Sequence, residues 1–260
     1  VKLSVADRWI VSRLQHAEAA VAEAIDGYRL DQAAQAIYEF IWNEYCDWYL
    51  ELSKPVLNSS QDPAELRGTR RTLVRVLEAV LRLTHPFMPF ITEEIWQRVA
   101  PLAGVQGETI MRQPYPRPEQ GKYDAEAEAE IAWLQAFLLG IRRIRGEMNI
   151  APGKPLPIVL QNGSAQDRAR LEQMRGFIEF LGRPESIRWL EAGEEAPEAA
   201  IALVGEMKLL VPMAGLIDKN AELARLDKER GRKRQEIERV AAKLANPSFA
   251  ENAPAQIVQK

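Results

Sequence analysis

The sequence is poor in the residues that build catalytic and metal centres. Its 260 residues include one cysteine, Cys46, and two histidines, His16 and His85. A single cysteine excludes a disulfide framework and any cysteine-based zinc site within the chain. Two histidines leave little material for a histidine metal cluster or for His-based catalysis. The composition therefore argues against a self-contained metalloenzyme or a Ser-His-Asp hydrolase, and we expect neither a metal nor a catalytic residue here.

Long hydrophobic runs are absent as well. The longest nearly apolar stretch runs from Ile131 to Ile141 and contains Gln135, which is far short of a membrane span. At the N-terminus, Asp7 lies within an amphipathic pattern that differs from a signal peptide. We therefore expect a cytoplasmic protein with no membrane partner. Because the first residue is Val1 rather than Met, we also expect a piece of a longer protein.

Positive charge is unevenly distributed although the net charge is only −3. A uniform basic coat for nucleic acid is therefore absent. Acidic residues gather between Glu119 and Glu130 and again between Glu185 and Glu206. Segregated signs of this kind suit a protein that meets a polyanion along particular surfaces. The residues in which positive charge gathers are Arg142, Arg143, Arg145, Lys154, Lys228, Arg230, Arg232, Lys233, Arg234 and Arg239.

The first hundred residues show helical periodicity throughout, which predicts an up-and-down helical bundle. The capping residues and the prolines set the expected boundaries. The predicted helices run from Ser4 to Gly27, from Asp31 to Lys54-Pro55, from Asp62-Pro63 to His85-Pro86, and onward from a cap at Thr92.

Two aromatic segments stand out in this bundle. In the first, an acid, Asp47, lies among Cys46, Trp48 and Tyr49, so it must face outward or be paired when buried. Routine partners for it would be Arg8 or Arg71. The second is a rigid proline corner, in which we expect three apolar side chains to plug into the core and His85 to end a helix. These three side chains are Phe87, Met88 and Phe90.

The pattern changes after the proline-rich segment that follows the bundle. A helix over 124–148, a strand over 156–160, a helix over 165–181 and short strands over 186–190, 200–204 and 208–212 predict a small α+β domain. From Ala214 apolar residues recur every 3.5 residues, which is typical of a coiled-coil helix; a returning helix is expected near Pro254. The fold class is mainly α, with predicted domains 1–118, 119–213 and 214–260.

Three motifs carry a resemblance to a known family. They are Ala6-Asp7-Arg8-Trp9-Ile10, Cys46-Asp47-Trp48-Tyr49 and His85-Pro86-Phe87-Met88-Pro89-Phe90. In this order and spacing the chain resembles the post-catalytic part of the bacterial valyl-tRNA synthetases, over essentially all 260 residues. The coiled-coil tail is similar to that of the valyl members. The isoleucyl sibling typically ends in a cysteine-rich zinc module, for which the chain has too few cysteines.

The resemblance implies a tRNA-binding part of an aminoacyl-tRNA synthetase, a ligase that joins valine to its tRNA with ATP. It implies an anticodon-binding role for the bundle. The family's ATP-binding signatures, His-Ile-Gly-His and Lys-Met-Ser-Lys-Ser, do not occur in this sequence, so we expect no cofactor to bind within it. In the family an Asn-, Arg- and Phe-bearing helix opens the bundle. That helix would precede Val1, so we expect part of the anticodon site to be missing.

Roles for the basic residues remain open between two interpretations. Arg142, Arg143, Arg145 and Lys154 are candidates for phosphate contact, or form a solvated helix face with ion pairs to Glu147. The second cluster, Lys228, Arg230, Arg232, Lys233, Arg234 and Arg239, resembles the family's contact with the outer corner of tRNA, or is the solvated flank of a coiled coil.

Rival functions also remain open. The chain is alternatively a helical interaction scaffold, a stand-alone RNA-binding protein, or the matching region of an isoleucyl- or leucyl-type synthetase. The apolar stripe of the C-terminal helix also allows self-association.

Overall fold

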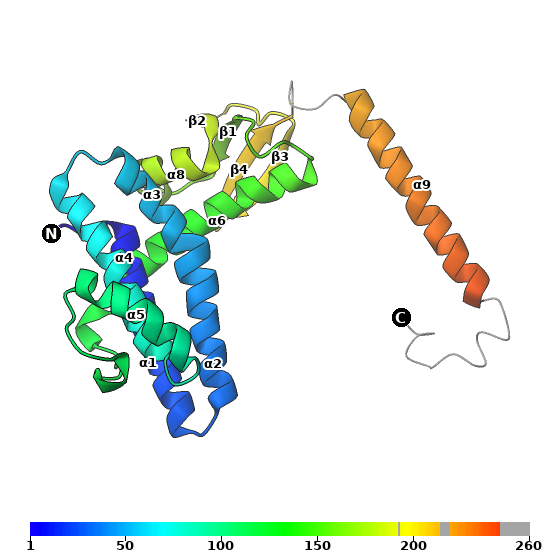
Figure 1. Ribbon diagram of the computed structural model, residues 1–260. Helices are drawn as coiled ribbons and strands as arrows, with labels where there is room; N and C mark the ends of the chain where they lie inside the picture. The colour runs from blue at the N-terminus through cyan, green and yellow to red at the C-terminus, as the bar shows by residue number, and fades with distance from the viewer. Residues whose placement is uncertain (192, 214–218, 245–260) are drawn as a thin grey trace. The chain divides into compact units, whose positions relative to one another are not determined.

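The computed structural model describes residues 1–191, 193–213 and 219–244, and within the last range the side chains of residues 227–242. The fold is mainly α with one small mixed sheet, as the sequence predicted (Figure 1). Residues 1–194 with 201–211 form one compact unit, and residues 195–200 with 212–260 form a second. The predicted division into three domains stays a prediction.

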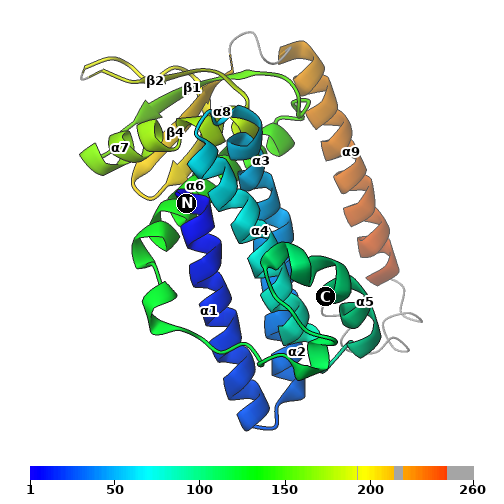
Figure 2. The ribbon, with the colours of Figure 1, turned by 60° about the vertical axis from the view of Figure 1, so that its left-hand side comes forward.

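A bundle of antiparallel helices forms the first part of the chain. Helix α1 packs against α2 and α4, and α4 packs against α5, as the two ribbon views show (Figures 1 and 2). The bundle elements are α1 (Val5–Asp26), α2 (Leu30–Glu39), the π-helical stretch η1 (Phe40–Tyr49), α3 (Leu50–Ser59), α4 (Pro63–Thr84) and α5 (Pro89–Ala103). Two 3₁₀ turns follow, η2 (Ile110–Arg112) and η3 (Gln120–Lys122).

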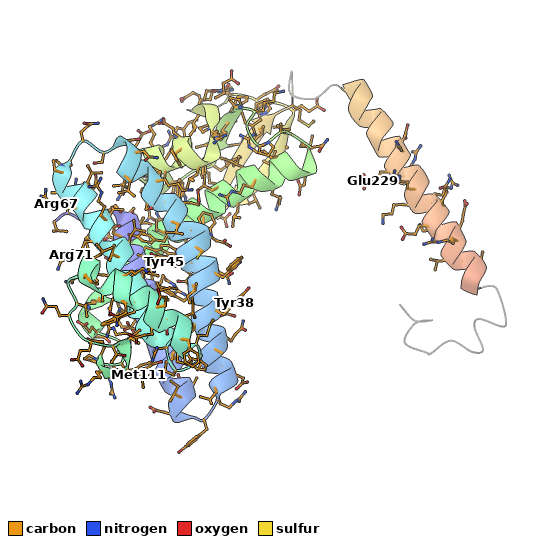
Figure 3. The ribbon with its side chains drawn as sticks, viewed as in Figure 1. Tyr38, Tyr45, Arg67, Arg71, Met111 and Glu229 are labelled. Atoms are coloured by element: carbon orange, nitrogen blue, oxygen red, sulfur yellow. The ribbon has the colours of Figure 1, made fainter. Side chains whose placement is uncertain are left out.

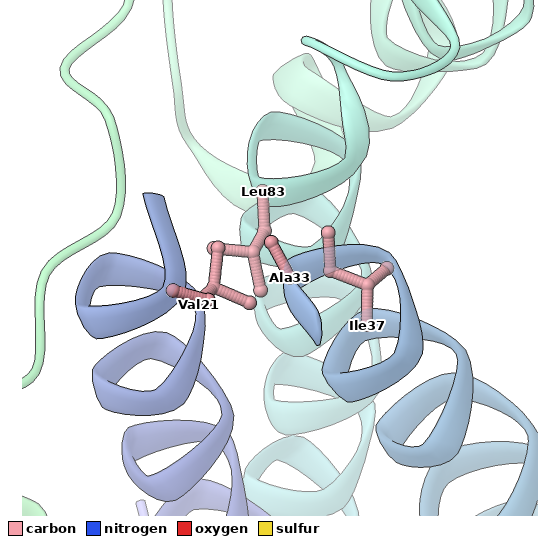
Figure 4. Packing of buried hydrophobic residues seen from close by; sticks show 5 residues of the cluster. Val21, Ala33, Ile37 and Leu83 are labelled. Carbon is pink, nitrogen blue, oxygen red and sulfur yellow. The ribbon is translucent and has the colours of Figure 1, made fainter. Parts of the chain in front are cut away.

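Apolar side chains from three helices close the end of the bundle. Val21 of α1, Ala33 and Ile37 of α2 and Leu83 of α4 form one buried cluster (Figure 4). Each is at most 5% exposed. Full burial of a side chain such as Val, Leu or Ile contributes about 1.5–3 kcal/mol. This cluster therefore stabilises the contact of α4 with α1 and α2.

The proline corner differs from its prediction. Phe87 is half-buried against the cluster just described, but Met88 is 54% and Phe90 89% exposed. The predicted cap at Thr92 is also wrong, because α5 already begins at Pro89 with Met88 as its N-cap. Proline at the first helical position needs no backbone donor, and the Thr92 hydroxyl donates back to the Met88 carbonyl at 2.8 Å instead.

Two further helix boundaries differ from the sequence pattern. Helix α2 begins at Leu30 with Arg29 as its N-cap and without a side-chain cap, so the predicted cap at Asp31 is wrong. The Asp31 carboxylate lies inside the first turn and pairs with the Arg29 guanidinium at 3.0 Å. The predicted stop at Pro55 is wrong, because α3 continues to Ser59. Pro55 removes one backbone donor, and it is itself buried where α3 packs against α4.

Helix α6 (Ala125–Glu147) joins the bundle through ion pairs to α1. Arg8 lies 2.9 Å from Asp124, the N-cap of α6. Arg13 lies 3.4 Å from Glu128 and 2.7 Å from Glu44 of η1. Some of the acids before Glu130 therefore form the ion pairs that hold α6 against α1. The C-terminal part of α6 packs against the sheet.

The sheet has the strand order β2-β1-β4-β3. Strand β1 pairs with β2 in parallel and with β4 antiparallel. The four strands lie within two residues of their predicted positions: β1 (Leu156–Gln161), β2 (Pro184–Trp189), β3 (Ala199–Val204) and β4 (Met207–Pro212). The sheet faces α6, since a Cβ added at Gly140 would lie 3.0 Å from Ala202.

One of the remaining helices differs from its prediction. The single helix expected over 165–181 is two helices, α7 (Ala165–Gln173) and α8 (Arg175–Gly182), separated at Met174. The C-terminal helix α9 spans Lys219–Leu244. The returning helix expected near Pro254 lies outside the described residues. Pairing of α9 as a coiled coil stays a prediction.

Candidate nucleic-acid interface

A buried aspartate fixes α4 against α1. Asp7 is fully buried and accepts hydrogen bonds from the Tyr49 hydroxyl at 2.6 Å, the Thr69 hydroxyl at 2.8 Å and the Ser4 hydroxyl at 2.8 Å. It also completes the predicted capping box of α1. Burial, followed by the charge of Asp7, raises the pKa of Tyr49. Asp47, by contrast, is exposed, so the buried acid of this region is Asp7.

Helix α4 exposes four arginines on one side. Arg67, Arg70, Arg71 and Arg75 are all exposed, and none of them has an ion pair or side-chain hydrogen bond within the part of the chain that the structure describes. Figure 3 shows Arg67 and Arg71 on the left-hand side of the helical bundle, whereas Tyr38 lies on the right-hand side of the bundle. We call these four residues the α4 arginine row.

The next arginine of α4 is engaged differently. The Arg82 guanidinium donates two hydrogen bonds to the buried Glu78 carboxylate, at 2.9 and 2.8 Å. The indole of Trp96 on α5 donates to the same carboxylate at 2.8 Å. Glu78, Arg82 and Trp96 therefore form a satisfied polar network between α4 and α5, and Arg82 does not belong to the row.

A cleft of about 570 Å³ lies between α1 and α4, with Arg71 and Arg75 among its lining residues. Glu18 also lines this cleft and is only 5% exposed. Burial raises the pKa of Glu18 to about 7, although the charges of Lys122 and Arg82 oppose the increase. A carboxylate in this position is costly to ionise.

Two of the predicted phosphate ligands on α6 are exposed. The Arg142 guanidinium carbon lies 5.2 Å from the ring centroid of Trp48, a cation–π contact. Arg143 forms an ion pair with Glu147 at 3.3 Å. The salt-bridged face expected as the alternative for this cluster is thus present at Arg143, while Arg142 keeps its charge at the surface.

Arg145 lies in a different environment from its neighbours. It is 8% exposed, and its guanidinium donates to the carbonyls of Lys154 at 2.5 Å, Ala151 at 3.2 Å and Gly182 at 3.2 Å. Burial, followed by the charge of Arg183, lowers its pKa. Arg145 therefore ties the end of α6 to the loop before β1. The side chain of Lys154, in that loop, is exposed.

The basic run on α9 is exposed and half of it is paired. Arg230 lies 2.9 Å from Asp227 and Lys233 lies 3.2 Å from Glu236. Arg234 lies 4.0 Å from Glu238. Lys228, Arg232 and Arg239 are also exposed. The described part of α9 thus presents cations on a polar helix whose own acids neutralise some of them.

The sequence prediction missed the α4 arginine row. The signal was present, because the twelve residues 66–77 contain four arginines and no acid. The sequence suggested Arg71 only as a possible partner of Asp47. The helical positions also place Arg67, Arg71 and Arg75 on adjacent turns of one face.

Neither a metal centre nor a membrane segment emerges from the described ranges. No group of three His, Cys, Asp or Glu side chains in these ranges could hold a metal ion. None of the helices within them combines the length and hydrophobicity that a bilayer crossing requires. The candidate nucleic-acid interface is therefore described by its exposed cations and by the helices that carry them.

Comparison with known families agrees with this arrangement of basic helices. Residues 7–160, which include the bundle, α6 and the α4 arginine row, match the anticodon-binding domain of tRNA ligases. The chain belongs to this family of anticodon-binding domains, which supports tRNA as its partner. Residues 218–260 match the tRNA-binding arm of valyl-tRNA synthetases. Both matches agree with the resemblance noted from the sequence motifs.

Proposed function

We propose that the chain is the tRNA-binding C-terminal part of a valyl-tRNA synthetase, which ligates valine to its cognate tRNA in the cytoplasm. The observation that carries the proposal is the order of two matched regions in one chain. An anticodon-binding domain over residues 7–160 is followed by a valyl-type tRNA-binding arm over residues 218–260. The first region supports tRNA binding, and the second supports valine as the amino acid.

The contribution of this chain to the reaction is substrate binding and positioning. Contacts far from the reacting atoms help catalysis by orienting the substrate and by supplying binding energy. We propose that the ATP of the reaction is bound outside these 260 residues, because the two nucleotide-binding signatures do not occur in them. We therefore assign no catalytic residue to this chain.

The charge distribution supports contact at separate surfaces. Arg142, Lys154 and the α9 cations remain candidates for phosphate contact because their side chains are exposed. Arg145 is a weaker candidate, since its guanidinium already binds backbone carbonyls. Backbone contacts of this kind position an RNA without specifying its sequence.

The test is direct binding of the 260-residue chain to tRNA transcripts. Fluorescence anisotropy with labelled valine, isoleucine and leucine tRNA should show the tightest binding for the valine tRNA. Equal affinity for all three would keep tRNA binding and remove the assignment to valine. Tighter binding of isoleucine or leucine tRNA would assign the chain to the corresponding synthetase, and no binding would favour a protein-interaction scaffold.

A further inference from the structure

The α4 arginine row gathers on one helix four exposed arginines that lack an acidic partner in the described part of the chain. Elsewhere on the unit some exposed arginines pair with a nearby acid, whereas Arg142 and Arg168 lie over tryptophan rings. Arg98 lies 3.0 Å from Glu94, and Arg175 lies 2.6 Å from Glu172. The four arginines of the row have no such partner among the described residues. Their positive charge is therefore left facing the solvent.

Holding these charges together has a cost. Like charges four residues apart on a helix destabilise it by about 0.2–0.5 kcal/mol per pair. Arg67 and Arg71 form one such pair, and Arg71 and Arg75 form the next. A polyanion that neutralised both pairs would remove this cost. The row therefore has the electrostatic character of a binding face.

The helix that carries the row is firmly held. Its N-terminus is capped by the Asp62 carboxylate, which accepts from the Ala64 amide at 2.8 Å. The Thr69 hydroxyl donates to the buried Asp7 at 2.8 Å. The Tyr45 hydroxyl donates to the Leu73 carbonyl at 2.9 Å. Contacts on the inner side of α4 thus flank the row along its length, so its backbone is fixed before a ligand arrives.

The spacing of the row suits an extended anion. Arg67 and Arg75 are eight residues apart, which is about 12 Å along a helix axis. Three guanidinium groups on successive turns therefore follow one line. Guanidinium is planar and binds phosphate oxygens with two parallel hydrogen bonds. A chain of phosphates fits this line better than a single small anion does.

We propose that Arg67, Arg71 and Arg75 bind the sugar–phosphate backbone of the tRNA anticodon stem–loop. This inference rests on the proposed function, and it assigns a contact surface that the clusters on α6 and α9 do not include. Arg70, on the adjacent part of the same side, adds to the local positive potential. The row positions the RNA on the bundle and does not read its bases.

The experiment compares two triple variants of the 260-residue chain. One carries Arg67→Gln, Arg71→Gln and Arg75→Gln. The matched control carries Arg98→Gln, Arg112→Gln and Arg175→Gln, which removes the same charge from arginines that are ion-paired at the surface. Glutamine preserves helix propensity, and circular dichroism checks that both variants are folded. Binding of valine tRNA is then measured between 50 and 200 mM salt.

Each phosphate contact contributes about 0.7–0.9 to the slope of log affinity against log salt. The salt slope of the α4 variant should be shallower by about two to three units. Its loss of tRNA affinity relative to the wild type should therefore be roughly 15- to 60-fold smaller at 200 mM salt than at 50 mM salt. The control should keep the wild-type slope. A third variant with lysine at the same three positions of α4 keeps the charge and should retain most of the slope.

The outcomes separate this inference from the function on which it rests. If the wild-type chain binds tRNA and the α4 glutamine variant has the slope of the control, the row does not contact phosphate and the inference is wrong. That result would leave an acidic protein surface as the ligand of the row. If the wild-type chain does not bind tRNA at all, the proposed function fails and the inference fails with it.

Discussion

Helices α4 and α9 are both basic, but their charges are neutralised to different extents. Residues 66–77 of α4 contain four arginines and no acid, whereas residues 227–242 of α9 contain six bases and four acids. Because acids recur three and four residues away, α9 forms its own ion pairs. The number of bases in the sequence therefore overestimates the net positive charge that α9 presents. The α4 row has fewer bases, but none of their charge is neutralised by acids in the same segment.

The two helices also differ in how they are supported. The inner side of α4 is buried, and Thr69 and Thr72 lie there beside Val76. All described side chains of α9 are exposed, including Ile237 at 68% and Val240 at 48%. A cation on α4 is therefore presented by a fixed helix. A cation on α9 is presented by a helix whose described side chains are not buried within its unit.

The largest effect is expected from removing the support of α4. Asp7→Ala leaves the hydroxyls of Thr69, Tyr49 and Ser4 buried without their acceptor. Leaving a buried hydroxyl without its hydrogen-bond partner costs about 1–3 kcal/mol, so the loss of the acceptor of three hydroxyls should lower the unfolding free energy by about 3 kcal/mol or more. Urea denaturation should show this decrease. A loss below about 1 kcal/mol would mean that α4 is held by apolar packing alone.

A smaller loss of stability is expected from a substitution at Arg145, which lies on α6. Arg145→Gln removes hydrogen bonds to four backbone carbonyls, and hydrogen bonds that involve a charged group contribute about 1.5–3 kcal/mol. The unfolding free energy should therefore fall by about 2–3 kcal/mol. The salt slope for tRNA binding should not change, and a flatter slope would return Arg145 to the phosphate-binding set.

A pH-dependent effect is expected at Glu18, in the cleft beside α4. Burial raises its pKa from the ordinary value of 4.5 to about 7, so between these values the folded chain binds more proton than the unfolded one. Stability therefore falls as the pH rises through this window. Glu18→Gln removes the cost of ionisation.

The Glu18 variant should be as stable as the wild type below pH 4.5 and more stable by about 1–2 kcal/mol at pH 8. This value is smaller than the full pKa difference would give, because solvent at the cleft screens the charge. Thermal unfolding at both pH values measures the difference. A stability difference that is the same at both pH values would contradict the raised pKa.

The smallest effect is expected on α9. Asp227→Ala removes the partner of Arg230, which is an exposed pair. Exposed ion pairs contribute about 0–1 kcal/mol, and alanine favours the helix. Helix content by circular dichroism should change little, while tRNA binding should become slightly tighter because Arg230 is freed. Weaker binding would mean that the intact pair is what the RNA requires.

The bundle could be predicted from the sequence because its helices have clear local signals. The Ser4–Asp7 capping box and the Asp62-Pro63 start both act within one turn, and both are present. One error falls where a contact between helices decides, because burial against α4 carries α3 through Pro55. The other is local: Arg29 and not Asp31 is the N-cap of α2, and the Asp31 carboxylate pairs with the Arg29 guanidinium.

The candidate interface was less predictable than the fold. Clusters of bases are visible in the sequence, but pairing and burial are properties of the structure. Arg145 has the same neighbours in sequence as Arg142 and Arg143, yet its side chain is buried among carbonyls. The α4 row was overlooked because Arg67, Arg71 and Arg75 are four residues apart and lie on one face only in a helix.

The central claim is that α4 and α9 contact different parts of the tRNA. The resemblance to valyl-tRNA synthetases leads us to expect the α9 arm at the outer corner of the tRNA, while α4 belongs to the matched anticodon-binding domain. An isolated anticodon stem–loop RNA has no outer corner. It therefore separates the two contacts.

The most direct measurement is the salt slope for the stem–loop and for the whole tRNA with two triple variants. One has glutamine at Arg67, Arg71 and Arg75, and the other has alanine at Arg230, Lys233 and Arg234. The α4 variant should flatten the slope by about two to three units for both RNAs, and the α9 variant should do so for whole tRNA only. An α9 variant that weakens stem–loop binding, or an α4 variant that leaves it unchanged, would contradict the account.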